Sequence, residues 1–273
     1  MSAISTEARP GDLREGALDV STGLRRWSVW WTLSWYSIRS QYRRTYFGPW
    51  WMTIQMVIFV AGLSLLFGVL LQQDLRFFVP YVAIGYIGFN WMTGLIQSGA
   101  NSMTGNSSRI LTSNQPLSIY VLRGVASNTI QFGHDAVVIA IVLLIFGVQL
   151  GWSLLYLPLA LALILINGLA IGLWLGPCVA RFRDVEPIVT SAVRVLFFFT
   201  PVFWVASDLS TRQQAWLSGW NPLAYFLELF RAPLLGLIPP PLTVVVTLCL
   251  TAINVAAGLI SFGRSRPRIA YWV

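Results

Sequence analysis

The chain has 273 residues, of which 56% are hydrophobic and 10% are charged, and its net charge of +8 comes from arginine alone, since the sequence contains no lysine. A soluble domain usually carries about 25% charged residues, so the composition excludes an ordinary globular protein and indicates one that lies largely in lipid. Without lysine the chain can hold neither a P-loop lysine nor a Schiff-base lysine. If ATP drives this protein, another chain must therefore bind it.

The N-terminal region divides into two parts. Residues 1–24 carry charges of both signs and no apolar run, which predicts a cytoplasmic tail and no cleavable signal peptide. Residues 25–48 are amphipathic at a helical period, so we expect a helix that lies in the cytoplasmic membrane interface. This helix is either a membrane-edge anchor or a lever that links a cytoplasmic partner to the first span. Trp27, Trp31 and Trp35 lie on one face of the expected helix, and Arg39 and Arg43 lie on the opposite face.

Six apolar stretches are predicted to cross the membrane, because a spanning helix needs about 20 apolar residues. They are 51–71, 79–100, 129–150, 154–180, 188–205 and 242–262. The sequence therefore predicts an all-α membrane domain of six transmembrane helices over 51–262, followed by a cytoplasmic tail, 263–273. With the N-terminus inside, 14 arginines fall in cytoplasmic segments and 3 in outer loops. This bias predicts that both termini are cytoplasmic.

The segment 211–237, before the last span, is apolar in part but also contains Glu228 and Arg231. Its apolar run is too short to span, and we expect it to be re-entrant or interfacial. Asn221 is typical of a helix start and Gly236 of a helix end. Glu228 and Arg231 are three positions apart, so they are expected to pair on one helix face.

Ionisable residues give little support for an enzyme or a metal site. Asp184 and Glu186 are a close acidic pair, but the arginines beside them favour a salt-bridged turn over a catalytic site. The cysteines and the single histidine have no zinc spacing. His134 and Asp135 fall in an apolar stretch, where they fit either a proton relay or a structural or conduit-lining role. We favour the second, because no further buried acid continues a relay.

Aromatic residues crowd the second span and the outer half of the fifth. They suit a glycan path, because sugar rings pack their C–H faces on aromatic rings. They also suit a lipid-facing belt at the outer interface, which their position alone favours. The residues concerned include Tyr81, Phe89, Phe197, Phe199, Phe203 and Trp204.

Four short motifs follow one another along the chain. They are Tyr42-Arg43-Arg44 with Gly48-Pro49-Trp50-Trp51, then Arg181-Phe182-Arg183-Asp184-Val185, Thr200-Pro201-Val202-Phe203-Trp204, and Asn221-Pro222-Leu223 continuing to Glu228, Arg231 and Gly236. Their order and spacing resemble the permease subunits of ABC-2 type polysaccharide exporters, the group that exports O-antigen, teichoic acid and cell-wall galactan. The resemblance covers about residues 25–262.

The resemblance implies a homodimer of this chain bound to two copies of a separate ABC ATPase. That ATPase would bind ATP and Mg²⁺, so this chain would be a transport subunit and not an enzyme. The cargo would be a lipid-linked glycan that crosses the plasma (inner) membrane, and no nucleic acid is expected. A permease for drugs or lipids is the alternative, and a proton-coupled transporter is less favoured.

The resemblance also implies roles for particular segments. Residues 25–46 would form the interface or gate helix, and residues 102–116 the coupling helix that docks on the ATPase. Residues 200–204 and 221–236 would form the outer gate. The residues expected to couple to the ATPase are Arg109, Leu111, Asn114, Pro116, Arg181 and Asp184, and those expected at the outer gate include Pro201, Asn221, Glu228 and Arg231.

Overall fold

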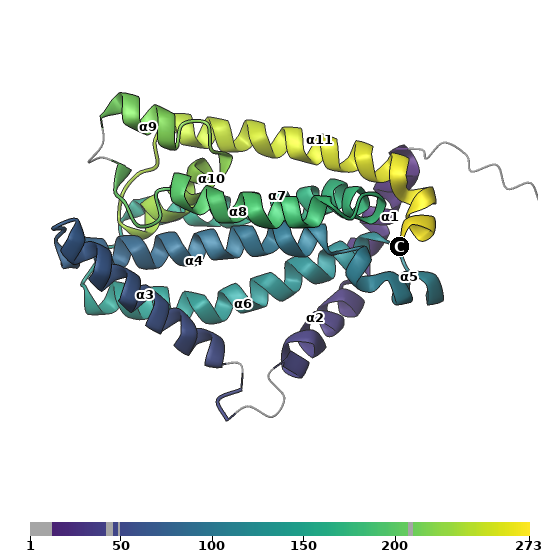
Figure 1. The fold of residues 1–273 in the computed structure, drawn as a ribbon, viewed down its shortest axis with the longest axis horizontal. Coiled ribbons are helices and arrows are strands. Elements are labelled where there is room, and N and C mark those ends of the chain that lie inside the picture. Colours follow the sequence, from purple (N-terminus) through teal and green to yellow (C-terminus); the bar gives the residue numbers. More distant parts are fainter. Residues whose placement is uncertain (1–12, 42–45, 49, 207–209) are drawn as a thin grey trace, which may run out of the picture.

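The computed structural model describes residues 13–41, 46–48, 50–206 and 210–273, which form helices joined by turns and contain no strand (Figure 1). The prediction of an all-α protein is confirmed for this part of the chain. The α-helices are α1 (Leu13–Arg25), α2 (Trp27–Gln41), α3 (Trp50–Leu70), α4 (Leu75–Ala100), α5 (Ser107–Thr112), α6 (Ser118–Ile145), α7 (Tyr156–Arg181), α8 (Val185–Phe199), α9 (Thr211–Leu217), α10 (Pro222–Leu234) and α11 (Pro241–Trp272), with 3₁₀ turns η1 (Thr104–Asn106) and η2 (Trp152–Leu155).

Five helices of the described part are long and apolar enough to cross a membrane. They are Trp50–Leu70, Leu75–Ala100, Ser118–Ile145, Trp152–Arg181 and Pro241–Trp272. The sixth expected span, 188–205, forms only α8, which has 15 residues and ends at Phe199. The backbone of Thr200 is extended, as is common before a proline, so Pro201 ends the helix before it reaches the usual spanning length.

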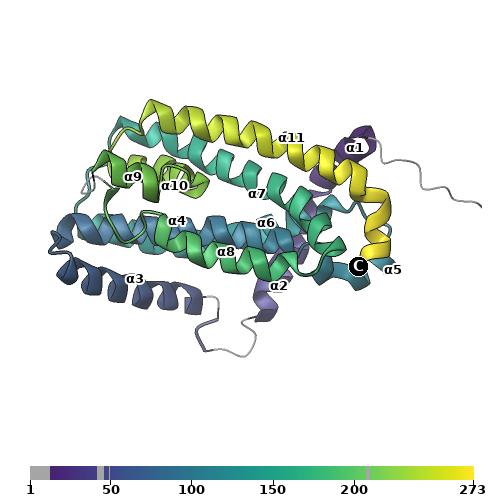
Figure 2. The same ribbon diagram turned by 45° about the horizontal axis from the view of Figure 1, so that its top comes forward.

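The long helices form a bundle, in which α4, α6, α7, α8 and α11 run roughly along one axis (Figures 1 and 2). Close packing of α4, α7 and α11 depends on small residues. A Cβ added to Gly99 would lie 2.8 Å from Gly172 Cα, and one added to Gly258 would lie 2.7 Å from the carbonyl oxygen of Ala170. Backbones approach closely at such positions, which is how helices gain packing energy in a membrane.

The main apolar core lies among α4, α6, α7 and α10. It contains Ile87 and Leu95 of α4, Leu163 of α7, and Leu227 and Phe230 of α10, each at most 5% exposed. Helix α10 packs against α4, α7 and α11 at one end of the bundle (Figure 2). The short segment expected to be re-entrant is therefore held among the long helices.

The two ends of the bundle differ. Helices α1 and α5 and the last turns of α11 lie at one end, which we call the terminal end (Figures 1 and 2). Helices α9 and α10, the start of α11 and the α3–α4 turn lie at the opposite end, which we call the far end. The expected coupling loop thus lies at the terminal end and the expected outer gate at the far end.

Several boundaries differ from the sequence-based expectation. Residues 13–24, expected in a tail, form α1, and the expected helix 25–48 is α2, which begins after a break at Arg26. Helix α6 begins well before residue 129. Residues 263–272, also expected in a tail, continue α11. Contacts at the terminal end account for these differences, because α1 packs against both α6 and α11 and orders segments that are not apolar enough to be recognised as spans.

Candidate functional site

The coupling candidates of the 102–116 loop lie on α5 and the turn after it. Ile110 anchors α5 in a buried cluster with residues of α6, α7 and α11. Its neighbour Leu111 is 61% exposed, and Arg109 and Asn114 are exposed as well. Arg109 Nη1 donates to Asn106 Oδ1 over 3.1 Å, which ties it to the preceding turn. Helix α5 therefore presents one apolar and several polar side chains on a firmly anchored element.

Arg181 and Asp184, the other coupling candidates, flank the turn between α7 and α8 and are both exposed. The guanidinium of Arg181 lies over the rings of Phe182 and Trp272, 4.9 and 5.6 Å from their centroids. Within the described residues neither Asp184 nor Glu186 forms an ion pair. The expected salt-bridged turn is wrong, because Arg181 stacks on rings from α11 and from its own turn instead.

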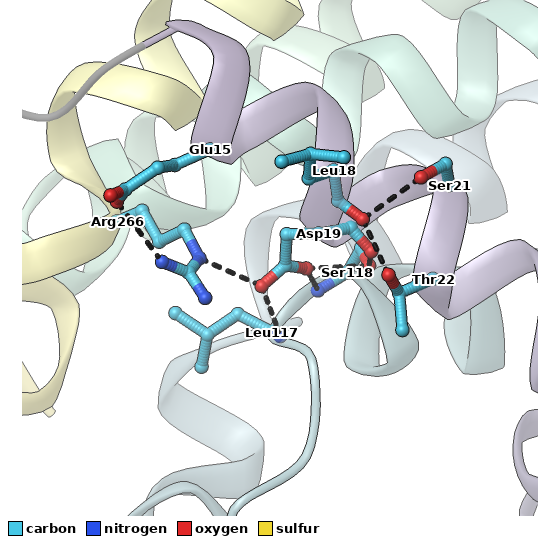
Figure 3. A network of polar contacts seen from close by, with 8 residues as sticks. All are labelled: Glu15, Leu18, Asp19, Ser21, Thr22, Leu117, Ser118 and Arg266. Atoms are coloured by element: carbon cyan, nitrogen blue, oxygen red, sulfur yellow. Dashed lines mark hydrogen bonds and ion pairs between the residues drawn. The ribbon is translucent and has the colours of Figure 1, made fainter.

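A buried acid that was expected in a tail joins three elements at the terminal end (Figure 3). The Asp19 side chain on α1 is 1% exposed. It accepts hydrogen bonds from the backbone N–H groups of Leu117 (3.2 Å) and Ser118 (3.0 Å) and from Ser118 Oγ (2.7 Å). Arg266 Nε of α11 donates to it over 2.8 Å. We call these four residues the Asp19 junction.

The Asp19 junction fixes where α6 begins. The first backbone N–H groups of a helix have no partner within it, and a carboxylate placed there satisfies them and interacts favourably with the helix dipole. Pro116, half-buried, comes directly before the capped residues. The expected coupling loop therefore ends at a point that is fixed by both α1 and α11.

Helix α2, the expected interface helix, docks on α6 through small polar residues. Ser34 Oγ donates to the carbonyl oxygen of Arg123 over 2.9 Å, and Arg123 Nη2 donates to Ser37 Oγ over 3.2 Å. Ile38 is buried in the same face. Arg123 Nη1 also donates to Asn106 Oδ1 over 2.5 Å, so one arginine connects α2 with the turn that precedes α5.

The tryptophan stripe of α2 points away from α6. Trp27, Trp31 and Trp35 are 63%, 44% and 50% exposed, and Arg39 is exposed too. Arg43 lies outside the described residues. An exposed row of tryptophans beside arginine fits a helix that lies at a membrane interface.

At the far end, Arg231 of α10 is buried and hydrogen-bonded to other parts of the protein. It is 2% exposed. Its Nη2 donates to Glu228 Oε2 and its Nη1 to the carbonyl oxygen of Pro201, both over 2.6 Å. The guanidinium also lies 3.9 Å from the ring centroid of Tyr81, whose hydroxyl donates to the carbonyl oxygen of Trp204 over 3.1 Å. The expected pairing of Glu228 with Arg231 is confirmed.

These expected gate residues line a cavity. Glu228, Arg231, Tyr81 and Pro201 are among the residues that line a space of about 630 Å³ between α4, α10 and the segment after α8. Because both terminal nitrogens of Arg231 donate to protein oxygens, its main effect is to hold the 201–204 segment against α10 and α4.

Asn221 provides a second link between the two gate segments. Its side-chain oxygen accepts a hydrogen bond from the backbone N–H of Leu223 over 3.0 Å, which caps α10 as the sequence predicted. Its Nδ2 donates to Thr200 Oγ1 over 2.7 Å. Asn221 and Thr200 are both 0% exposed, so this link is buried. At the other end of α10, Gly236 has a φ of 76° and ends the helix as expected.

The aromatic candidates form an internal cluster more than a belt around the outside. Phe197 of α8 lies 5.4 Å from Phe89 of α4 and 5.4 Å from Phe203, measured between ring centroids. Phe203 in turn lies 4.6 Å from Phe67 of α3. Because Phe89 is 5% exposed and Phe197 and Phe203 pack against the main core, these rings join α3, α4 and α8.

Two of the aromatic candidates lie at the edge of this cluster. Phe199 packs against Trp220 with the ring centroids 5.5 Å apart. Trp204 Nε1 donates to the carbonyl oxygen of Phe198 over 3.2 Å. Both contacts hold the turn after α8 against its neighbours at the far end.

Comparison with known proteins identifies the family of the chain. The sequence profile of the ABC-2 type transporter family matches residues 28–235. The chain belongs to the ABC-2 transporter family. It is 21% identical over 196 residues to the O-antigen export system permease protein RfbA of Myxococcus xanthus, and 22% identical over 195 residues to that of Klebsiella pneumoniae. Each alignment covers 71% of this chain and 75% of the relative.

The family match of this ABC-2 protein runs from α2 to the end of α10. It includes the coupling candidates and both gate segments, while Asp19 and Arg266 lie outside it. Sequence reasoning missed the Asp19 junction. The sequence did contain one signal: Glu15 and Asp19 are four positions apart, in a region with helical periodicity. However, no neighbouring residue indicated that either acid would be buried.

Proposed function

We propose that this protein is the permease subunit of an ATP-driven exporter, which moves a lipid-linked glycan from the cytoplasmic to the outer side of the plasma (inner) membrane. The observation that carries the proposal is the likeness to O-antigen export permeases over 71% of the chain. The aromatic cluster and the gate cavity support it, because aromatic rings and convergent polar groups suit saccharides better than they suit apolar cargo.

The proposed assembly is a homodimer bound to two copies of a separate ABC ATPase. Membership of the ABC-2 family supports the ATPase partner, and a polymeric cargo needs a path longer than the cavities within one copy. The terminal end would face the cytoplasm, where Arg109, Arg123 and Arg181 would follow the positive-inside tendency. Helix α8 with residues 200–206 would make the sixth crossing, and α9 and α10 would be re-entrant.

The cargo is tested by depleting the protein in cells and extracting the labelled lipid-linked saccharides from the membrane. We expect long lipid-linked chains to accumulate on the cytoplasmic side, and restoring the wild-type gene should clear them. An unchanged pool, with the ATPase still co-purifying, would overturn the glycan assignment in favour of an ABC-2 permease for drugs or lipids.

The coupling surface is tested by placing a charge on the exposed apolar residue of α5. Leu111→Glu is expected to reduce co-purification of the ATPase at least fivefold, because a buried apolar contact would be replaced by an unpaired charge. Leu237→Glu is the matched control, since Leu237 is also exposed (53%) but follows α10 at the far end. Equal ATPase recovery with both variants would exclude α5 as the docking element.

A further inference from the structure

A polar cavity lies between α3, α4 and α6, which are three of the long apolar helices of the bundle. Its volume is about 220 Å³. It is separate from the gate cavity at the far end and shares no lining residue with it. The residues that line it are Met52, Gln55, Met56, Phe59, Tyr86, Asn90, Gln131 and Asp135. Five of these eight side chains can form hydrogen bonds, which is unusual at membrane depth.

Asp135 is the least satisfied of these groups. It is 3% exposed, and its Oδ1 is buried with no hydrogen-bond partner among the described residues. A buried carboxylate without donors is costly, so such groups in membrane helices usually mark a functional site. The side chain lines the cavity and is placed to accept hydrogen bonds from whatever enters it.

The neighbouring His134 does not share this role. Its Nδ1 lies 2.9 Å from the carbonyl oxygen of Ile130, and its ring packs edge-on against Trp50 with the centroids 6.2 Å apart. His134 is absent from the cavity lining. The two adjacent residues point to different surroundings, as expected for positions about 100° apart on a helix, and Asp135 has no histidine partner in the cavity.

One wall of the cavity is aromatic and continues toward the gate. Tyr86 stacks on Phe59 with the ring centroids 4.3 Å apart and an interplanar angle of 23°. Tyr86 also meets Phe197 edge to face at 6.2 Å, and Phe197 contacts Phe203, two residues after Pro201. A chain of touching rings therefore leads from the cavity to the segment that Arg231 holds at the far end.

The lining defines the chemical class of a ligand. Three amides and a carboxylate offer acceptors and donors around an aromatic wall, which is the combination that hydroxyl groups and C–H faces of a sugar ring satisfy together. None of the lining residues is basic, so the cavity disfavours a phosphate or another anion. It is also smaller than the roughly 300–1,000 Å³ typical of pockets for drug-sized ligands, which suits a single ring.

We propose that this cavity binds one uncharged sugar residue of the exported glycan during its passage, with Asp135 and the amides of Gln55, Asn90 and Gln131 as hydrogen-bonding groups. The inference rests on the proposed function and adds a sugar-binding site within the bundle to it. Because no basic residue lines it, the site suits the hydroxylated part of the cargo and not an anionic group.

Site-specific photo-crosslinking tests the site in the intact complex. Benzoylphenylalanine replaces Gln55, an exposed residue at the rim of the cavity, in cells that label their glycan from radioactive sugar. We expect at least fivefold more labelled glycan on this variant than on a control with the same probe at Ile253, an exposed position on α11. Equal labelling at the two positions in an exporting strain overturns the inference. If the Gln55 variant does not export, the same comparison at Gln131 decides.

Export rates of Asp135 variants provide a second readout. Asp135→Leu removes the acceptors and is expected to slow export at least fivefold at equal protein level, while Asp135→Asn, which keeps one acceptor oxygen, retains more of the rate. Equal export by wild type and Asp135→Leu would overturn the inference. This outcome differs from failure of the proposed function, in which depletion of the protein leaves the lipid-linked saccharide pool unchanged.

Discussion

Arg231 illustrates how a charged side chain is accommodated within an apolar bundle. Its guanidinium is bound by a carboxylate, a backbone carbonyl and an aromatic face, which come from α10, the Thr200–Trp204 segment and α4. Each of these interactions is strengthened by the low local dielectric. The arginine therefore holds the two gate segments and α4 in one arrangement, and the gate cavity keeps its shape as long as these contacts persist.

Replacing Arg231 should destabilise the protein. Arg231→Met removes the charge and two hydrogen bonds. We expect the free energy of unfolding to fall by about 3 kcal/mol. This is the low end of the range for a broken buried ion pair, because the Glu228 side chain is 35% exposed. This corresponds to a fall in melting temperature of roughly 6–12 °C, measured on the detergent-solubilised protein. Arg212→Met, at an exposed arginine of the same end, is the control and should change stability by less than about 0.5 kcal/mol. A similar shift for both would contradict the role assigned to Arg231.

Contacts between residues that are close in the sequence could be predicted better than contacts between residues that are far apart. The cap at Asn221, the helix end at Gly236 and the Glu228–Arg231 pair all follow from residues within a few positions of one another, and all three are confirmed. The contacts of Arg231 with Pro201 and Tyr81 join residues that are 30 and 150 positions away. Periodicity carries no information about such pairs, because they depend on how α4, α8 and α10 pack.

At the scale of elements, the terminal end is a junction of helices that are far apart in the sequence. Helix α1 lies against both α6 and α11, and Gly16 and Gly23 allow this close approach: a Cβ added to Gly16 would lie 2.7 Å from Gly263 Cα, and the space beside Gly23 is taken by Ser118. Asp19 then fixes the start of α6. A displacement of α5 by a bound ATPase would therefore reach α1, α6 and α11 together.

Weakening the Asp19 junction should release α1. Asp19→Asn removes the negative charge that interacts with both Arg266 and the first turn of α6. We expect this to destabilise the docking of α1 by about 1.5–3 kcal/mol. Local opening should rise at least tenfold, since about 1.4 kcal/mol corresponds to a factor of ten. Limited trypsin digestion measures this as faster cleavage at Arg25, the last residue of α1, and at Arg26, which follows it.

The control for this variant is Glu15→Gln. Glu15 also contacts Arg266, at 3.5 Å, but it is 58% exposed, and such exposed pairs contribute little to stability. Its cleavage rate should match that of the wild type. Unchanged cleavage in Asp19→Asn would show that α1 is held by its glycine contacts alone, and the junction would lose its assigned role.

The crossing of α4 and α7 supports a further prediction about helix packing. Gly99→Ala would place a Cβ 2.8 Å from the backbone of Gly172, so the two helices would have to move apart. We expect the free energy of unfolding to fall by about 1–3 kcal/mol, which is the usual effect of overpacking. The measurement is a lower melting temperature. Gly62→Ala on α3 is the matched control, because a Cβ there meets nothing within 4 Å, and it should be neutral or slightly stabilising.

At the scale of the whole molecule, the sequence predicted the class of protein better than the extent of its helices. The five long apolar helices were recognised because hydrocarbon demands a long run of apolar residues. Helix α1, the start of α6 and the last turns of α11 were missed because contacts between helices stabilise them, and because arginine, serine and glycine residues interrupt their apolar residues. Phe89 and Tyr81 were recognised as aromatic candidates, but their burial, at 5% exposed each, depends on neighbours that no single segment reveals.

The number of crossings decides whether the two termini lie on the same side of the membrane. An odd number of crossings would separate the two termini, whereas α1 and the end of α11 lie at the same end of the bundle (Figures 1 and 2). In the proposed six-span arrangement helix α8 would complete the count, although its 15 residues reach only about 22 Å. We expect the Thr200–Ala206 segment to supply the remaining length, which the gate contacts allow because irregular backbone is tolerated where protein covers it.

Cysteine labelling on intact cells tests this sixth crossing. Cys178 and Cys249 are first replaced by serine, and single cysteines are introduced at Phe182 and Trp220, exposed residues on either side of α8. A membrane-impermeant maleimide should label Trp220→Cys in intact cells and Phe182→Cys only after permeabilisation. Because exposure is similar at the two positions, 53% and 56%, a difference in labelling reports sidedness. Labelling of both from one side would mean that α8 does not cross, and that the termini lie on opposite sides of the membrane.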